Sequence, residues 1–355
     1  MLKKLTYFQF LVILFSSCEE YYAPKIDDVS GHLVVDALIT NDLSKNYVRL
    51  STTRRYYDEQ ETSIILYATV ELVDKNGVIL EGTENGAGSF TFKTVPEIGN
   101  SYKLRIYYQN FAYESEMLTM PPLPEILNAS SVEKAKKEYR SDIYGVVTPT
   151  SFPGNDICVD TPVTDSLAYY RFSTRSVLEW VYTPKPPYQH GTFLNEILGW
   201  NSFYPTNFNI AGPKTFSQAS VKIEKHPLVW LANESEYYMH TDSLVSVGWI
   251  LIIDQYGTSK GSFDYHEKLN SQFAADGSLF DPVPDQIHGN IRCVSDSSKI
   301  VFGYFDLNTY RQYRYFLKMD IKYNGDSLRQ LLTYPFIIDF GRTDQQSLPP
   351  YWWIW

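Results

Sequence analysis

Residues 257–261 read Gly-Thr-Ser-Lys-Gly, a spacing that could present Ser259 as a nucleophile. In hydrolases the G-x-S-x-G sequence forms a sharp turn between a strand and a helix, and here a predicted strand precedes it and a predicted helix follows it. Asp285 and His288 are the acid and histidine that could complete a relay. Two side chains so close together in a proline-bounded loop are poorly placed to orient the imidazole. The pattern therefore favours a glycine turn leading into a helix, and no catalytic residue is predicted.

The histidine and acidic residues show no metal-binding pattern. No two histidines lie at i, i+2 on a predicted strand or at i, i+4 on a predicted helix, the clustering that zinc sites prefer. Asp156, Asp160 and Asp165 lie near one another but not at the EF-hand spacing, and a solvated acidic loop explains them. We expect neither a metal nor a cofactor. The six histidines are His32, His190, His226, His240, His266 and His288.

Aromatic residues are the feature most indicative of binding, because Tyr, Phe and Trp make up 16% of the chain. Exposed tyrosine and tryptophan give rigid contact area that stacks on sugar rings or packs against a protein partner. The densest stretches are residues 180–208 and 351–355, although packing within the scaffold is an alternative for the first and a docked strand end for the second. A glycan or a peptide is the expected ligand, and the candidate binding residues are Trp180, Tyr188, Trp200 and Tyr204.

The N-terminus indicates where the protein resides. Lys3 and Lys4 precede a mainly apolar run, residues 5–15, which is too short to span a membrane and typical of a secretory signal. Two serines then lead to Cys18, an arrangement that resembles the lipobox of bacterial lipoproteins, in which the thiol is acylated. Phe15 departs from that pattern, because a smaller aliphatic residue is commoner there. The sequence predicts a signal peptide over 1–17 and a lipid anchor as the only membrane contact.

Glu19 and Glu20 follow the cysteine directly. They resemble the export signal that sends lipoproteins of Bacteroidota to the outer face of the outer membrane, and a solvated tether over residues 18–30 is the plainer alternative. The expected location is the cell surface.

The 355-residue chain has 44% hydrophobic residues and a net charge of −10, so it can bury a sizeable core, and its acidity argues against nucleic acid as a partner. With Cys18 acylated, Cys158 and Cys293 remain. In an oxidising compartment they could form one disulfide, or both could be buried free thiols, and the sequence leaves both options open.

Residues 31–120 alternate apolar and polar side chains in short runs, as in Ser101–Tyr107, which indicates half-buried strands. Asn76-Gly77 marks a hairpin turn between two of these runs. The segment predicts a sandwich like those of immunoglobulin or fibronectin type III domains. It ends at residues 121–125, Pro-Pro-Leu-Pro-Glu, where three prolines make a stiff hinge.

Residues 126–355 predict a larger β-rich domain with few short helices. Alternating apolar positions over 245–253 and 313–321 indicate core strands, and residues 262–274 have helical spacing. Residues 184–213 are rich in proline and aromatic residues without a sustained period, which predicts a long excursion rather than a sheet strand. The expected fold class is therefore mainly β.

The lipobox cysteine, the early sandwich, the proline hinge and residues 264–307 resemble an uncharacterised family of Bacteroidota outer-membrane lipoproteins. The motifs that carry the resemblance are Gly289-Asn290-Ile291, Gly303-Tyr304-Phe305, Pro350 and Trp352. Many members carry a cysteine pair before the terminal proline, and this chain has none there. The resemblance implies an all-β lipoprotein often encoded beside a TonB-dependent receptor.

We therefore expect an accessory or ligand-capture subunit of a TonB-dependent nutrient receptor. A free-standing carbohydrate-binding or adhesion module is an alternative that explains the aromatic residues equally well. A glycan-active hydrolase is a third, and it would need two carboxylates across a cleft.

Overall fold

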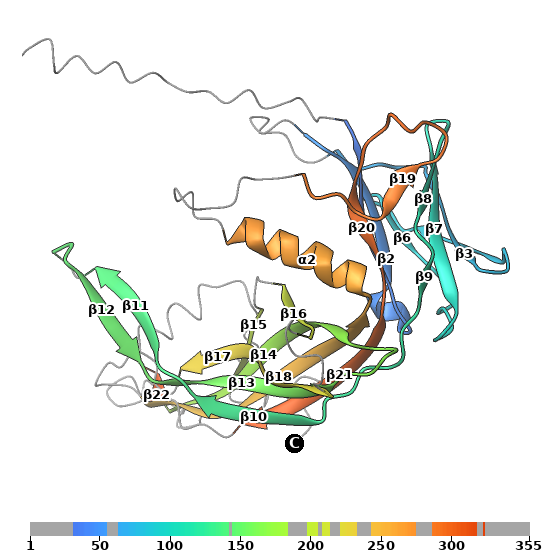
Figure 1. Ribbon diagram of the computed structural model, residues 1–355. Coiled ribbons are helices and arrows are strands. Elements are labelled where there is room, and N and C mark those ends of the chain that lie inside the picture. Colours follow the sequence, from blue (N-terminus) through green and yellow to red (C-terminus); the bar gives the residue numbers. More distant parts are fainter. Residues whose placement is uncertain are drawn as a thin grey trace, which may run out of the picture.

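A computed structural model describes nine stretches of the chain, in which two β-sandwiches lie on either side of a single described α-helix (Figure 1). Among these residues, no helix combines the length and the apolar character needed to span a membrane. The predicted mainly β fold is confirmed. The described residues are 31–54, 63–141, 144–183, 197–204, 208–213, 221–232, 243–274, 286–317 and 322–323.

Two sheets form the N-terminal sandwich. The first sheet has the order β20-β1-β2-β6-β5, and its strands are β1 (Leu33–Ile39), β2 (Tyr47–Thr52), β5 (Thr83–Glu84), β6 (Ser89–Thr91) and β20 (Val301–Leu307). The second has the order β19-β8-β7-β3-β4, with β9 also paired to β7. Its strands are β3 (Thr69–Asp74), β4 (Ile79–Glu81), β7 (Ser101–Tyr108), β8 (Phe111–Ser115), β9 (Leu118–Thr119) and β19 (Ile291–Cys293).

The alternating pattern explains this core. Along β7 every second side chain is buried, and Leu104 and Ile106 pack into one apolar cluster with Val35 and Leu50 of the facing sheet. The predicted hairpin is confirmed: Gly77 adopts φ +85° in the turn between β3 and β4, a conformation that glycine adopts at little cost.

Residues 31–120 do not complete this sandwich alone, which corrects the predicted domain boundaries. β19 pairs with β8, and β20 pairs in parallel with β1, so a segment from the far side of the proline hinge supplies two strands. Sequence patterns report local alternation and contain no signal for such long-range pairing. The immunoglobulin-like assignment stays a prediction.

The second sandwich packs a small sheet against a larger one. The small sheet has the order β10-β13-β17: β10 (Asn128–Glu133), β13 (Gly154–Pro162) and β17 (Lys222–Ala232). The large sheet has the order β15-β14-β18-β21, with β16 on β14 and β22 on β18. Its strands are β14 (Tyr169–Thr183), β15 (Ile197–Phe203), β16 (Asn209–Ala211), β18 (Ser243–Thr258), β21 (Thr309–Leu317) and β22 (Lys322–Tyr323).

Side chains of both sheets build the core of the second sandwich. Ile157 of β13 and Leu231 of β17 pack with Tyr170 of β14 and Leu251 of β18. A two-stranded hairpin, β11 (Lys136–Ser141) and β12 (Val147–Phe152), extends from this body (Figure 1).

Two sequence predictions need correction here. The stretch 184–213 is not simply an excursion, because β15 and β16 within it pair with β14. The long neighbouring strand supplies hydrogen bonds that hold these segments extended despite their weak alternation. The disulfide alternative is contradicted, since Cys158 on β13 and Cys293 on β19 are both free and buried, in different sandwiches.

The predicted helix is confirmed as α2 (Lys260–Phe273), between the two sandwiches (Figure 1). Ser259 is its N-cap, and its side chain accepts a hydrogen bond from the backbone N–H of Ser262. The G-x-S-x-G sequence thus forms a turn that leads into a capped helix, which is the interpretation that the sequence favoured over a nucleophile elbow.

Candidate functional site

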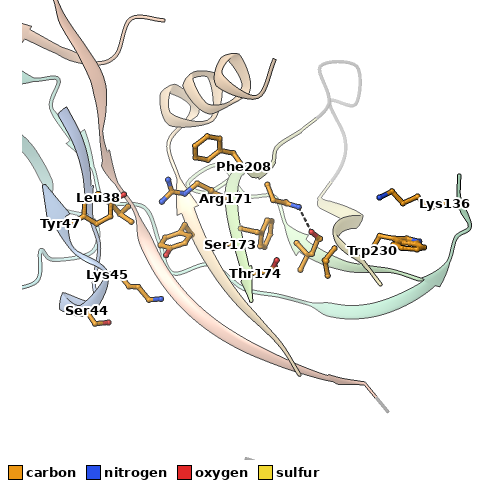
Figure 2. Close-up of a pocket in the computed structure, with 15 residues that line it drawn as sticks. Leu38, Ser44, Lys45, Tyr47, Lys136, Arg171, Ser173, Thr174, Phe208 and Trp230 are labelled. Atoms are coloured by element: carbon orange, nitrogen blue, oxygen red, sulfur yellow. Dashed lines mark hydrogen bonds between the residues drawn. The ribbon is translucent and has the colours of Figure 1, made fainter. Parts of the chain in front are cut away.

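A cleft of about 870 Å³ lies between the two sandwiches and is the candidate site. Figure 2 shows residues of the N-terminal sandwich on one side, Arg171 and Phe208 in the middle, and Lys136 with Trp230 on the far side. The N-terminal sandwich contributes Leu38, Ser44, Lys45 and Tyr47, the first of them from β1, the next two from the 3₁₀ helix η1 (Leu43–Lys45) and the last from β2. The second sandwich contributes Lys136, Arg171, Phe172, Ser173, Thr174, Phe208, Asn209, Leu228, Val229, Trp230 and Tyr256.

Three cationic side chains line the cleft, and none of the described lining residues is acidic. Lys45 Nζ lies 2.8 Å from Asp254 Oδ2, and this carboxylate also accepts hydrogen bonds from Tyr310 and Gln312. Lys136 lies at the start of the extended hairpin and places its Nζ 5.5 Å from the centroid of the Trp230 ring. Lys45 is among the described lining residues, whereas Asp254 is not.

Arg171 is the central cation, and a buried polar network fixes its position. Its Nη1 lies 3.3 Å from Asp306 Oδ2 and 3.3 Å from His266 Nε2. Ser262 donates a short hydrogen bond to the other oxygen of Asp306. The network joins β14, β20 and α2, so both sandwiches hold the guanidinium.

His266 serves this network in its neutral form. Burial is the main cause that lowers its pKa, and the charge of Arg171 acts in the same direction against the raising effect of Asp306. Its Nδ1 lies 2.9 Å from the carbonyl oxygen of Ser262, so Nδ1 carries the proton and Nε2 accepts from Arg171. This geometry differs from a catalytic relay, because Ser262 donates to the carboxylate rather than to the imidazole.

Aromatic rings also line the cleft. The guanidinium carbon of Arg171 lies 4.8 Å from the centre of the Tyr256 ring, a cation–π contact. Burial raises the pKa of Tyr47 to about 12, so this phenol stays neutral. Phe208 packs edge-on against His266 at 5.1 Å between ring centroids and remains 37% exposed.

A second histidine, His226, contacts two residues that line the cleft. His226 stacks on Phe172 at 5.5 Å and lies 2.6 Å from Asn209 Oδ1. Burial lowers the pKa of His226 to about 4, so the ring is neutral and donates to the Asn209 oxygen. The Asn209 amide nitrogen is then directed to the carbonyl oxygens of Pro227 and Leu228 on β17.

The predicted site residues meet this cleft only in part. Trp180 lies on β14 and Trp200 on the neighbouring strand β15, but the structure does not describe their side chains. The other predicted residues lie outside the described part of the chain: Tyr188, Cys18, Glu19, Glu20 and residues 351–355. Tyr204 is 57% exposed. Phe208 is the member of the predicted 180–208 stretch found among the described lining residues.

Sequence reasoning missed the cations. Lys45, Lys136 and Arg171 lie in three separate elements, and no local spacing connects them. His288, the candidate third member of a relay, is exposed, and Asp285 lies outside the description. The described residues contain no group of three or more His, Cys, Asp or Glu side chains able to hold a metal ion.

Two of the motifs that carried the family resemblance meet in space, Gly289-Asn290-Ile291 and Gly303-Tyr304-Phe305, while Pro350 and Trp352 lie outside the described residues. The Asn290 side chain donates to the carbonyl oxygen of Phe305 and accepts from its N–H, both at 2.9 Å. A Cβ on Gly289 would lie 1.6 Å from the Gly303 carbonyl oxygen, so this approach requires glycine. These contacts fix β19 and β20 in the N-terminal sandwich.

Comparison with known proteins gives one family match. No curated protein and no solved structure matches the chain significantly. A family model described as a domain of unknown function, DUF4249, matches residues 19–314, which include every described residue that lines the cleft and every described strand except the end of β21 and β22. The chain therefore belongs to the DUF4249 family.

Proposed function

We propose that this protein is a lipid-anchored capture subunit on the outer face of the outer membrane, where it binds a ligand in the cleft and serves a TonB-dependent receptor. The observation that carries the proposal is the cleft itself, a cavity of about 870 Å³ whose described lining combines aromatic rings with three cations. Sites of this size with a few convergent polar groups are typical of ligand binding.

Binding explains this lining better than catalysis does. A glycosidase requires two carboxylates across its cleft, and the described lining residues include no carboxylate. Ser259 caps a helix, and the buried Ser262 donates to Asp306. These contacts fix structural elements and leave Ser259 and Ser262 without the geometry of an activated nucleophile.

The location rests on the N-terminal residues. Acylation of Cys18 would anchor the chain, and residues 18–30 would form the tether that leads to Gly31, the first described residue. Glu19 and Glu20 would direct export to the surface.

Purification from native membranes tests the assignment. The full-length chain with an affinity tag should co-purify with a β-barrel receptor from detergent-solubilised outer membranes. Cys18→Ala, which lacks the acylated thiol, is the matched control and should leave the outer-membrane fraction and lose the partner. Glu19→Ala/Glu20→Ala should remain anchored but resist protease added to intact cells.

A free-standing carbohydrate-binding module is the second candidate, and the aromatic walls of the cleft favour it equally. The same purification separates the two functions. Recovery of the anchored chain without a barrel, under conditions that preserve other receptor complexes, would contradict the accessory role and favour this candidate.

A further inference from the structure

We propose that the ligand of the cleft is an acidic oligosaccharide, whose carboxylate or sulfate groups meet Lys45, Arg171 and Lys136 while its sugar rings pack on the aromatic walls. The inference rests on the proposed capture function and specifies the ligand class for the same site.

The distribution of charge is the first argument. The whole chain carries a net charge of −10, yet the described lining of the cleft contains three cations and no carboxylate. Asp254 and Asp306 stabilise Lys45 and Arg171 from outside this lining, and each also accepts hydrogen bonds from neutral side chains. An anion in the cleft would meet fixed positive groups without displacing these carboxylates.

The pairing of cations with rings is the second argument. Two of the cations lie over rings that also line the cleft, Arg171 over Tyr256 at 4.8 Å and Lys136 over Trp230 at 5.5 Å. Lys45 lies over Tyr310 at 4.7 Å, a ring outside the described lining. An acidic sugar carries an anionic group on a ring with apolar faces, so one residue of the ligand can satisfy both partners. Nearby hydroxyl groups suit sugar hydroxyls: Ser44, Ser173 and Thr174.

The backbone of the walls favours a glycan over an acidic peptide. An extended peptide binds by adding a strand to a free sheet edge. At Arg171 and Phe172, β14 pairs with β16 on one side and with β18 on the other, and at β17 the Asn209 amide already lies within hydrogen-bond distance of two carbonyl oxygens. These strands therefore present side chains to the cleft, and side-chain recognition suits a sugar chain.

Calorimetry with the detergent-solubilised full-length lipoprotein tests the proposal, using four probes at low and moderate salt. An oligogalacturonate supplies carboxylates, and its methyl ester supplies the same rings without charge. A sulfated galactan oligosaccharide supplies sulfate, and an oligoglutamate peptide supplies charge without sugar. We expect at least one acidic glycan to bind ten times more tightly than the ester and the peptide, with affinity that falls as salt rises. The stronger of the two acidic glycans identifies the anionic group.

Variants locate the site. Lys136→Gln should weaken binding about two- to fivefold, the effect of one exposed charge, whereas Lys137→Gln, on the next residue of the same strand and absent from the lining, should not change it. Trp230→Leu should weaken binding about tenfold or more, as expected for an aromatic anchor. Melting temperatures close to the parent's confirm that each variant is folded.

Three results would overturn the inference: no binding of either acidic glycan, equal binding of the ester, or peptide binding as tight as glycan binding. Equal effects of Lys136→Gln and Lys137→Gln would also refute the site. Because these assays need no receptor, failure here leaves the accessory role standing if a barrel still co-purifies. Conversely, glycan binding without a barrel partner would support the inference and contradict the accessory role.

Discussion

Asn290 should be one of the most important single residues for the stability of the N-terminal sandwich. β20 is an edge strand, and the Asn290 side chain continues its ladder by pairing with the N–H and the carbonyl oxygen of Phe305, both at 2.9 Å. Asn290 is buried, with 8% of the residue exposed, so water cannot readily replace its side chain. Asn290→Ala would leave two buried backbone groups of Phe305 without partners.

The expected cost follows from these two groups. Each unsatisfied buried donor or acceptor costs about 1–3 kcal/mol, so the substitution should destabilise the fold by about 2–6 kcal/mol. For a chain of this size, with an unfolding entropy of about 2.1 cal/mol/K per residue, that corresponds to a fall of roughly 3–8 °C in melting temperature. Asn128→Ala, at an exposed position of β10, is the matched control and should change stability by less than about 0.5 kcal/mol.

Thermal unfolding followed by circular dichroism, together with urea denaturation, measures the difference. Hydrogen exchange adds a local readout, because the Phe305 amide should lose protection in the variant. If Asn290→Ala melts within 2 °C of the parent and of the Asn128→Ala control, the pairing of Asn290 with β20 does not stabilise the sandwich, and the reasoning is refuted.

Gly303→Ala should lower the soluble yield and the melting temperature, because φ is +91° and a Cβ would lie 1.9 Å from the Val35 carbonyl oxygen; a variant as stable as the parent would contradict this close approach. Cys158 and Cys293 should resist a thiol reagent in the native state and react once the chain is denatured, and rapid native labelling would show that they are accessible. The free energy of unfolding should fall as pH falls from 6.5 to about 4, because burial lowers the pKa of His226 and the unfolded chain therefore takes up the proton first. His226→Gln should flatten this pH dependence, and an unchanged profile would show that His226 does not cause it.

The sequence predicted the elements whose signals are local. Alternation identified β7, Asn76-Gly77 identified the hairpin, and the spacing of Phe263 and His266 identified α2. It failed where distant segments determine structure: β20 joins β1 across more than 250 residues, and β15 is extended because β14 pairs with it. For the same reason, the aromatic composition indicated a binding function but did not show where the cleft lies.

The cleft is held by connections that favour a preformed site over a hinged one. Only Asn308 separates β20 from β21, so an almost continuous strand runs from the first sandwich into the second. The side chain of Asn41 in the N-terminal sandwich forms hydrogen bonds with the N–H and the carbonyl oxygen of Tyr310 in the second sandwich. Lys45 donates a hydrogen bond to Asp254 across the same boundary. Together with the Arg171–Asp306 pair, these contacts fix Lys45 and Arg171 relative to the rings before a ligand arrives. Preorganisation of this kind lowers the entropic cost of binding. The capture function that we propose would gain affinity from such a site without needing a conformational change.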